Sequence, residues 1–208
     1  MVRGVFFLAV GLGLAAPLAA APLTVRIVDS AGRPVRDAVV TLYPVGSAAH
    51  APRSGARFVV AQRNLQFQPF LTIVPVGANV SFPNLDPTKH HVYSFSPAKK
   101  FELKLFAKDQ SRTVHFDRPG VVALGCNIHD QMSAFIVVTD SSWTARTNGQ
   151  GMAIFADAPN APARLTVWHP YLRAPGGRLQ QAVTPAQRSA SFQLRLRVPP
   201  PAMAMRDY

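Results

Sequence analysis

The chain has 208 residues, which is enough for one large domain or two small ones. It carries 22 Lys and Arg against 10 Asp and Glu, a formal net charge of +12, yet it contains no recognisable nucleic-acid-binding motif. Short alternating runs of Val, Thr and Phe are separated by turn residues, among them 19 prolines and 13 glycines. No segment repeats the helical spacing of apolar residues over more than one turn, so the sequence predicts an all-β fold.

The first residues have the pattern of a secretory signal peptide. Arg3 precedes an apolar run from Gly4 to Leu14, and small residues follow up to Ala20. A membrane anchor is the alternative, but the run is shorter than the roughly 20 residues that span a bilayer, and Pro17 interrupts its end. We therefore expect that residues 1–20 are cleaved and that the chain is periplasmic. No later segment is long and apolar enough to predict a membrane span after cleavage.

Two segments that lie far apart in the sequence, residues 22–50 and 143–198, both contain strand patterns. The first contains two strand patterns around a turn, and the second contains several more. The runs Asp29–Val40 and Thr147–Pro159 resemble parts of a carboxypeptidase-regulatory or transthyretin-like β-sandwich. This resemblance implies a discontinuous outer domain with a second domain inserted into one of its loops. The alternative is three consecutive β-elements that share one core.

Residues 56–140 contain the most closely spaced strand patterns, which is typical of a β-sandwich or a barrel. We expect strands within Leu71–Phe82, His91–Phe95, Phe101–Phe106, Arg112–Phe116, Val121–Leu124 and Ala134–Val138. At the other end of the chain, residues 199–208 begin with three prolines and are predicted to form a disordered tail.

The chain has one cysteine, Cys126, which cannot form a disulfide within the chain. In an exported protein such a residue is an intermolecular link, a reactive thiol or a metal ligand. A strand pattern ends at Cys126, His129 and Met132 follow within six residues, and the next strand begins at Ala134. A thiolate, an imidazole and a thioether on one loop are ligand types of a blue-copper site. Zinc is the main rival, but methionine is a poor zinc ligand and only one thiolate is available.

This loop lacks one ligand, which should come from the edge of a strand elsewhere in the chain. Two adjacent histidines, His90 and His91, stand at a loop-to-strand junction. If the strand begins at His90, then His90 and Val92 share one face, whereas His91 and Tyr93 share the other. The pattern of residues therefore leaves both histidines open as the missing ligand.

Residues 58–139 resemble the cupredoxins, the blue copper proteins of the amicyanin and plastocyanin type. Asn84 and Asp86, followed by His90 and His91, resemble the region that carries the first copper ligand in that family. Similar chains are often labelled methylamine-utilisation proteins. Cupredoxins usually place an asparagine directly after the first ligand, where this chain has His91, and this departure keeps His91 open as the ligand.

The spacing of Cys126, His129 and Met132 is similar to the short ligand loop of amicyanins. The resemblance implies a cupredoxin-like Greek-key β-sandwich that binds one copper ion through His90, Cys126, His129 and Met132. It also implies that His129 lies nearest to the surface and passes the electron.

From these observations we expect a type 1 copper protein that carries single electrons and is not an enzyme. Hydrolase motifs are missing, and six scattered histidines cannot build the trinuclear cluster of a multicopper oxidase. The basic charge favours an acidic redox protein as the partner. The alternatives are a copper-delivery protein and a non-catalytic accessory subunit.

Overall fold

The computed structural model describes residues 22–46, 55–129 and 131–198. Within these ranges the chain is built from β-strands and one short 3-10 turn at Pro175–Gly177, which confirms the predicted all-β fold class. No helix in the described residues is long and apolar enough to cross a membrane. The predicted signal peptide, residues 1–20, and the predicted tail, residues 199–208, lie outside the described residues.

The first and last parts of the chain pair with each other in two sheets, here called the outer sandwich. In one sheet β1 (Leu23–Asp29) lies between β14 (Met152–Phe155) and β17 (Ser189–Leu194), and β1 and β17 are parallel. The other sheet has the order β13, β2, β15 and β16, which span Thr144–Arg146, Val39–Pro44, Ala163–Trp168 and Arg178–Val183. Alternating apolar residues such as Val25, Ile27 and Leu165 fill the core between these sheets.

The strands between β2 and β13 form a second sandwich, here called the inner sandwich. Its five-stranded sheet has the order β6, β12, β11, β8 and β9, spanning Leu71–Pro75, Ser133–Thr139, Gly120–Gly125, His90–Ser96 and Lys99–Phe106. The opposite sheet has the order β10, β7 and β3, spanning Ser111–Phe116, Ala78–Pro83 and Phe58–Val59. A hairpin of β4 (Ala61–Arg63) and β5 (Gln66–Gln68) completes it. Phe82, Phe106 and Phe116 fill a core separate from that of the outer sandwich.

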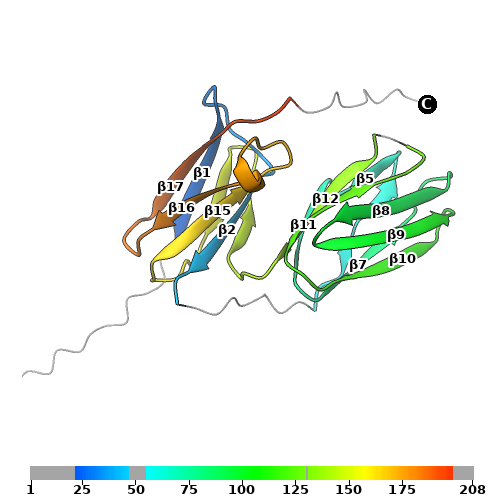
Figure 1. Ribbon diagram of the computed structural model, residues 1–208, viewed down its shortest axis with the longest axis horizontal. Helices are drawn as coiled ribbons and strands as arrows, with labels where there is room; N and C mark the ends of the chain where they lie inside the picture. Colours follow the sequence, from blue (N-terminus) through cyan, green and yellow to red (C-terminus); the bar gives the residue numbers. More distant parts are fainter. Residues whose placement is uncertain (1–21, 47–54, 130, 199–208) are drawn as a thin grey trace, which may run out of the picture.

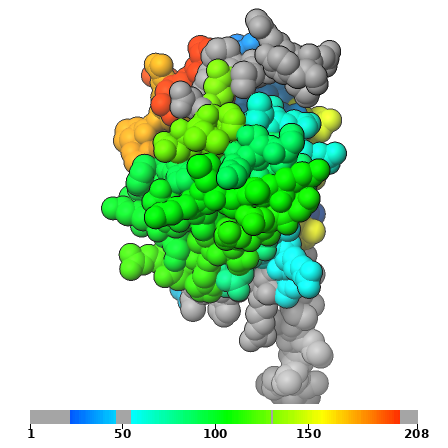
Figure 2. All heavy atoms as spheres, turned by 90° about the vertical axis from the view of Figure 1, so that its right-hand side faces the viewer, coloured from blue at the N-terminus to red at the C-terminus, as the bar shows by residue number. Residues whose placement is uncertain are grey.

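The two sandwiches lie side by side, with the inner one on the right of Figure 1. The chain leaves the outer sandwich after β2 and returns in β13, which pairs with β2. Between the sandwiches, Val39 of β2 packs with Leu71 and Val137 of the inner sheet, and the rings of Phe135 and Trp168 meet at 5.4 Å. The outer sandwich therefore covers the β6–β12 part of the inner sheet. Figure 2 looks onto the opposite end, where green segments from the middle of the chain form the surface.

A polar contact reinforces this interface and predicts a pH dependence. Tyr43 of β2 donates a hydrogen bond of 3.0 Å to Asp140, which follows β12. Burial and this hydrogen bond raise the pKa of Tyr43 from 10.0 to about 12. A raised pKa in the folded state stabilises the fold fully below pH 10, and this contribution is lost as the pH rises towards 12.

The wild type should lose folding stability between pH 10 and pH 12, and we expect Tyr43→Phe, which cannot ionise, to lose less over the same range. Urea denaturation at several pH values measures this difference. Tyr171→Phe, in the same sandwich, controls for the deletion of a phenol elsewhere. Parallel stability curves for wild type and Tyr43→Phe above pH 10 would contradict the expectation.

Candidate metal centre

The loop between β11 and β12 presents Cys126, His129 and Met132 from one short turn. The two strands pair directly up to Gly125 and Ser133, so the loop begins at Cys126 and ends at Met132. The Met132 N–H donates a hydrogen bond of 2.9 Å to the His129 carbonyl oxygen, which closes the turn. Cys126 and Met132 are only 3% and 2% exposed and belong to the inner core. Both sulfur ligands are therefore held by packing as well as by the strands.

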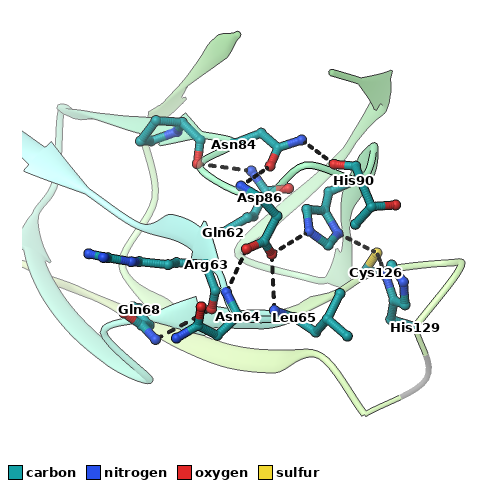
Figure 3. A network of polar contacts seen from close by, with 12 residues as sticks. Gln62, Arg63, Asn64, Leu65, Gln68, Asn84, Asp86, His90, Cys126 and His129 are labelled. Atoms are coloured by element: carbon teal, nitrogen blue, oxygen red, sulfur yellow. Dashed lines mark hydrogen bonds and ion pairs between the residues drawn. The ribbon is translucent and has the colours of Figure 1, made fainter. Parts of the chain in front are cut away.

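His90 joins this loop from the neighbouring strand β8. Tyr93 of β8 pairs with Gly125 of β11, and a bulge between His90 and Val92 shifts the register at the start of β8. His90 is fully buried, and its Nδ1 lies 4.0 Å from Cys126 Sγ. His129 Nδ1 lies 3.7 Å from the same sulfur atom. Figure 3 shows the two rings on either side of the thiol.

The spacing of these atoms suits a shared metal ion. One nitrogen from each histidine and the cysteine sulfur all lie within 4.8 Å of one another, and Met132 lies close to them. Bonds of ~2.0 Å to nitrogen and ~2.3 Å to sulfur, at an angle of ~120°, separate the two donor atoms by about 3.7 Å. The observed separations of 3.7 and 4.0 Å are near that value. Two imidazoles, one thiolate and one thioether form the ligand set of a type 1 copper site.

His91 points away from this centre. Its Nε2 lies 2.9 Å from Glu102 Oε1 on β9, and its ring lies 5.6 Å from that of Tyr93, on the opposite face of β8 from His90. Of the two histidines that the sequence left open, the structure brings His90 to Cys126 and leaves His91 with Glu102.

Asp86 is the residue of the site whose role the sequence did not indicate. Its Oδ2 lies 2.8 Å from His90 Nε2, so the carboxylate accepts a hydrogen bond there when Nε2 carries the proton. The carboxylate also accepts hydrogen bonds of 2.6 and 3.0 Å from the backbone N–H groups of Asn64 and Leu65. The resemblance placed Asp86 in the region of the first ligand, but the sequence did not indicate its hairpin partners, which lie more than twenty residues upstream.

The turn that Asp86 contacts joins β4 to β5 in an unfavourable conformation. Asn64 and Leu65 both have positive φ, 54° and 55°, as in a two-residue hairpin turn that favours Asn-Gly. Leucine rarely adopts this region because its Cβ crowds the backbone. Asp86 therefore braces a strained turn and fixes the His90 ring at the same time (Figure 3).

Asn84 organises the loop that carries Asp86. Its side-chain oxygen accepts from the Asp86 N–H, and its amide donates to the carbonyl oxygens of Thr88 and Phe106, at 2.8–3.0 Å. Asn84 is fully buried. Because moving this buried amide would break all three hydrogen bonds, Asn84 fixes the path of the chain from β7 to His90.

The electrostatics of the site favour an ionised Asp86 and a neutral His129. Burial works to raise the pKa of Asp86, but the hydrogen bonds from Leu65, His90 and Asn64 outweigh it and hold that pKa below its usual value. Burial lowers the pKa of His129, and the nearby His90 adds to this effect, while Asp86 opposes it. A neutral imidazole keeps a lone pair free for a metal ion.

Comparisons with known proteins match only the structure. No protein-family model and no curated protein matches the sequence. Among solved structures, a copper-containing nitrite reductase from Thermus scotoductus SA-01 is 24% identical, with 46% of this chain and 25% of that chain covered and a TM-score of 0.39. This chain thus spans about a quarter of the length of that reductase.

Two smaller proteins match over nearly their whole length. A purple cupredoxin from Nitrosopumilus maritimus is 19% identical, with 39% of this chain and 99% of that chain covered and a TM-score of 0.37. A reduced Cu(I) amicyanin is 19% identical, with 47% of this chain and 98% of that chain covered and a TM-score of 0.37. The resemblance of the outer segments to a carboxypeptidase-regulatory or transthyretin-like sandwich stays a prediction. The predicted resemblance to cupredoxins is confirmed, and the cluster of His90, Cys126, His129 and Met132 fits a type 1 copper site.

Proposed function

We propose that this chain is a periplasmic type 1 copper protein that carries single electrons and binds one copper ion through His90, Cys126, His129 and Met132. The convergence of two imidazole Nδ1 atoms on Cys126 Sγ, at 4.0 and 3.7 Å, carries this proposal. The buried Met132 at the end of the same loop supports it. Copper bound there supplies a one-electron couple, Cu(II)/Cu(I).

The residues around the centre suit a carrier rather than a catalyst. His90 and Cys126 are fixed by neighbouring strands and by Asp86, so the ligands keep one arrangement in both oxidation states. His90, Cys126 and Met132 are buried, whereas His129 is partly exposed and Ile128 beside it is 48% exposed. This favours His129 as the ligand nearest to a partner. The net charge of +12 favours an acidic redox protein as that partner.

We also propose that residues 56–140 form the copper domain, inserted into an outer domain of residues 22–50 and 143–198. Strands β2 and β13, which precede and follow the inner sandwich in the sequence, pair with each other, and each sandwich has a core of its own. Both observations support this division.

The test is electrochemistry of the mature protein loaded with one equivalent of Cu(II). We expect an intense visible band, a reversible one-electron wave and fast electron self-exchange. Met132→Leu should keep the band and shift the potential, because the axial thioether binds weakly and tunes the couple. A protein that exchanges electrons slowly but passes copper rapidly to a chelator would instead indicate copper delivery. A protein that binds no copper would overturn the proposal.

A pair of neighbouring variants tests the choice of histidine. His90→Ala removes the nitrogen nearest to Cys126 on β8, so we expect the visible band to weaken or vanish and the copper affinity to fall more than about 100-fold. His91→Ala removes a ring that contacts Glu102 and should leave the band in place. Copper titration followed by absorption and electron paramagnetic resonance measures both. Loss of the band in His91→Ala alone would assign the ligand to His91.

A further inference from the structure

The basic residues of the outer sandwich are all arginines. Residues 22–46 and 143–198 contain ten arginines and no lysine, against three aspartates and no glutamate. Three of these arginines form ion pairs with two of the aspartates: Arg33 with Asp29, and Arg36 and Arg146 with Asp37. The other seven form no ion pair in the part of the chain that the structure describes. Because a planar guanidinium group binds phosphate through two parallel hydrogen bonds, arginine suits phosphate oxyanions better than lysine does.

Three of the unpaired arginines lie on the outward face of the sheet formed by β14, β1 and β17. Core residues alternate along β1 and β17 with residues that point away from the core, and Arg26 is one of the latter. The alternation continues beyond β17, since Leu196 packs against the outer core as Leu194 does. Arg195 and Arg197 therefore face outward on the same side as Arg26, and all three are exposed.

A fourth arginine lies directly opposite Arg195. The bridge between Leu172 and Leu196 extends the sheet, and the Arg173 N–H donates a hydrogen bond of 2.8 Å to the Arg195 carbonyl oxygen. Opposite residues in such a pair have Cβ atoms about 4.5–5.5 Å apart, and like charges there destabilise the sheet. Neither guanidinium group has a carboxylate partner within the described ranges, so an anion from outside the chain is needed to neutralise the pair.

This face also carries exposed apolar side chains, and it is turned away from the inner sandwich. Ile154 of β14 is 60% exposed, and Val198, which follows Arg197, is 90% exposed. The inner sandwich packs on the other sheet, through Val39 and Trp168, so β14, β1 and β17 form the far layer of the outer sandwich (Figure 1). Arginines interspersed with exposed aliphatic side chains suit the surface of an anionic bilayer, which offers phosphate groups and an acyl boundary.

We infer that the outward face of β14, β1 and β17, together with Arg173, docks the protein onto a membrane that contains anionic phospholipids. Headgroup phosphates accept hydrogen bonds from the four arginines, and Ile154 and Val198 extend into the interface. The bound protein holds the inner sandwich on the side away from the bilayer, so the exposed Lys100 and Lys104 of β9 stay free for a redox partner. This inference does not depend on copper.

Cosedimentation of the mature protein with lipid vesicles tests the docking. Vesicles of phosphatidylcholine alone are compared with vesicles of phosphatidylcholine and phosphatidylglycerol in equal parts. We expect binding only to the anionic vesicles, and weaker binding as the salt rises above about 0.1 M, where the Debye length is about 10 Å. An arginine at such a surface contributes about 1 kcal/mol, a factor of about five in binding. The double variant Arg173→Gln/Arg195→Gln should therefore lower the partition coefficient about 25-fold.

Two control variants separate this face from net charge and from folding. Lys100→Gln/Lys104→Gln removes two exposed cations from the inner sandwich and should change the partition coefficient less than about twofold, because distant charges are screened. Arg195→Gln alone should not lower the unfolding temperature, because it relieves a pair of like charges. Equal losses of binding in the two double variants would overturn the inference, as would a wild type that does not bind the anionic vesicles.

A soluble polyanion distinguishes a bilayer from an acidic polysaccharide. Ile154→Ser should weaken binding to the anionic vesicles several-fold and leave binding to dextran sulfate unchanged, because a polysaccharide offers no acyl boundary. Binding to dextran sulfate through Arg173 and Arg195, with none to vesicles, would assign the face to a polysaccharide and contradict membrane docking. Each of these results leaves the proposed copper site standing.

Discussion

Cys126→Ser should abolish the intense visible absorption of the copper-loaded protein and weaken copper binding more than any other single change at the site. The band arises from charge transfer between a thiolate and Cu(II), and a serine hydroxyl neither ionises near neutral pH nor matches the softness of sulfur. His90 and His129 would remain on either side of position 126, so weak Cu(II) binding through nitrogen alone can persist without the colour.

The fold should survive this change, which makes the result interpretable. Serine and cysteine are similar in size, and Cys126 forms no disulfide. The cost is that of burying one hydroxyl beside two imidazoles that can bond it, about 1 kcal/mol. Thermal unfolding of apo-protein measures that cost, and copper titration measures the loss of affinity. Met132→Leu is the matched control, because it alters the same loop and leaves the thiolate. A blue Cys126→Ser protein would show that this residue is not a ligand.

The ligand loop could be predicted because its chemistry is local. Three ligand types fall within seven residues between two strand patterns, and the structure places them between paired strands β11 and β12. His90 was harder to predict as a ligand, because the sequence does not show which of two adjacent histidines at the end of a strand faces the loop. The contact of His90 with Cys126 and that of His91 with Glu102 separate the two, and they depend on the pairing of β8 with β11 and with β9.

Long-range pairing explains what the sequence could not predict. The strand patterns within Leu71–Phe82 correspond to β6 and β7, but the two strands join different sheets, and β6 runs parallel to β12. Alternation of apolar residues identifies a strand and its buried face, but it does not identify the neighbour. The same limit hid Asp86, since its carboxylate acts on a hairpin more than twenty residues upstream.

Asp86→Ala should produce the largest effect on the apo-protein among changes at the site. Asp86 is 5% exposed, and its loss leaves the N–H groups of Asn64 and Leu65 and the ring nitrogen of His90 without their acceptor. An unsatisfied buried donor costs about 1–3 kcal/mol, but the two hairpin N–H groups are only part-buried and can turn to water, so we expect a destabilisation of about 2–4 kcal/mol. Asp86→Asn keeps one acceptor oxygen in place and should lose less. Urea denaturation of apo-protein measures both variants.

Copper affinity should fall with stability in Asp86→Ala, for a separate reason. The carboxylate holds the proton on Nε2 of His90, which leaves Nδ1, the atom 4.0 Å from Cys126 Sγ, free to bind a metal. Removing such a partner typically lowers metal affinity about 10- to 100-fold. Competition with a chelator measures the change, and Asp117→Ala, which removes an exposed carboxylate paired with Lys99, should leave the affinity unchanged. If Asp86→Ala lost stability but kept wild-type affinity, Asp86 would brace the hairpin alone, and the orientation of His90 would come from the packing around β8.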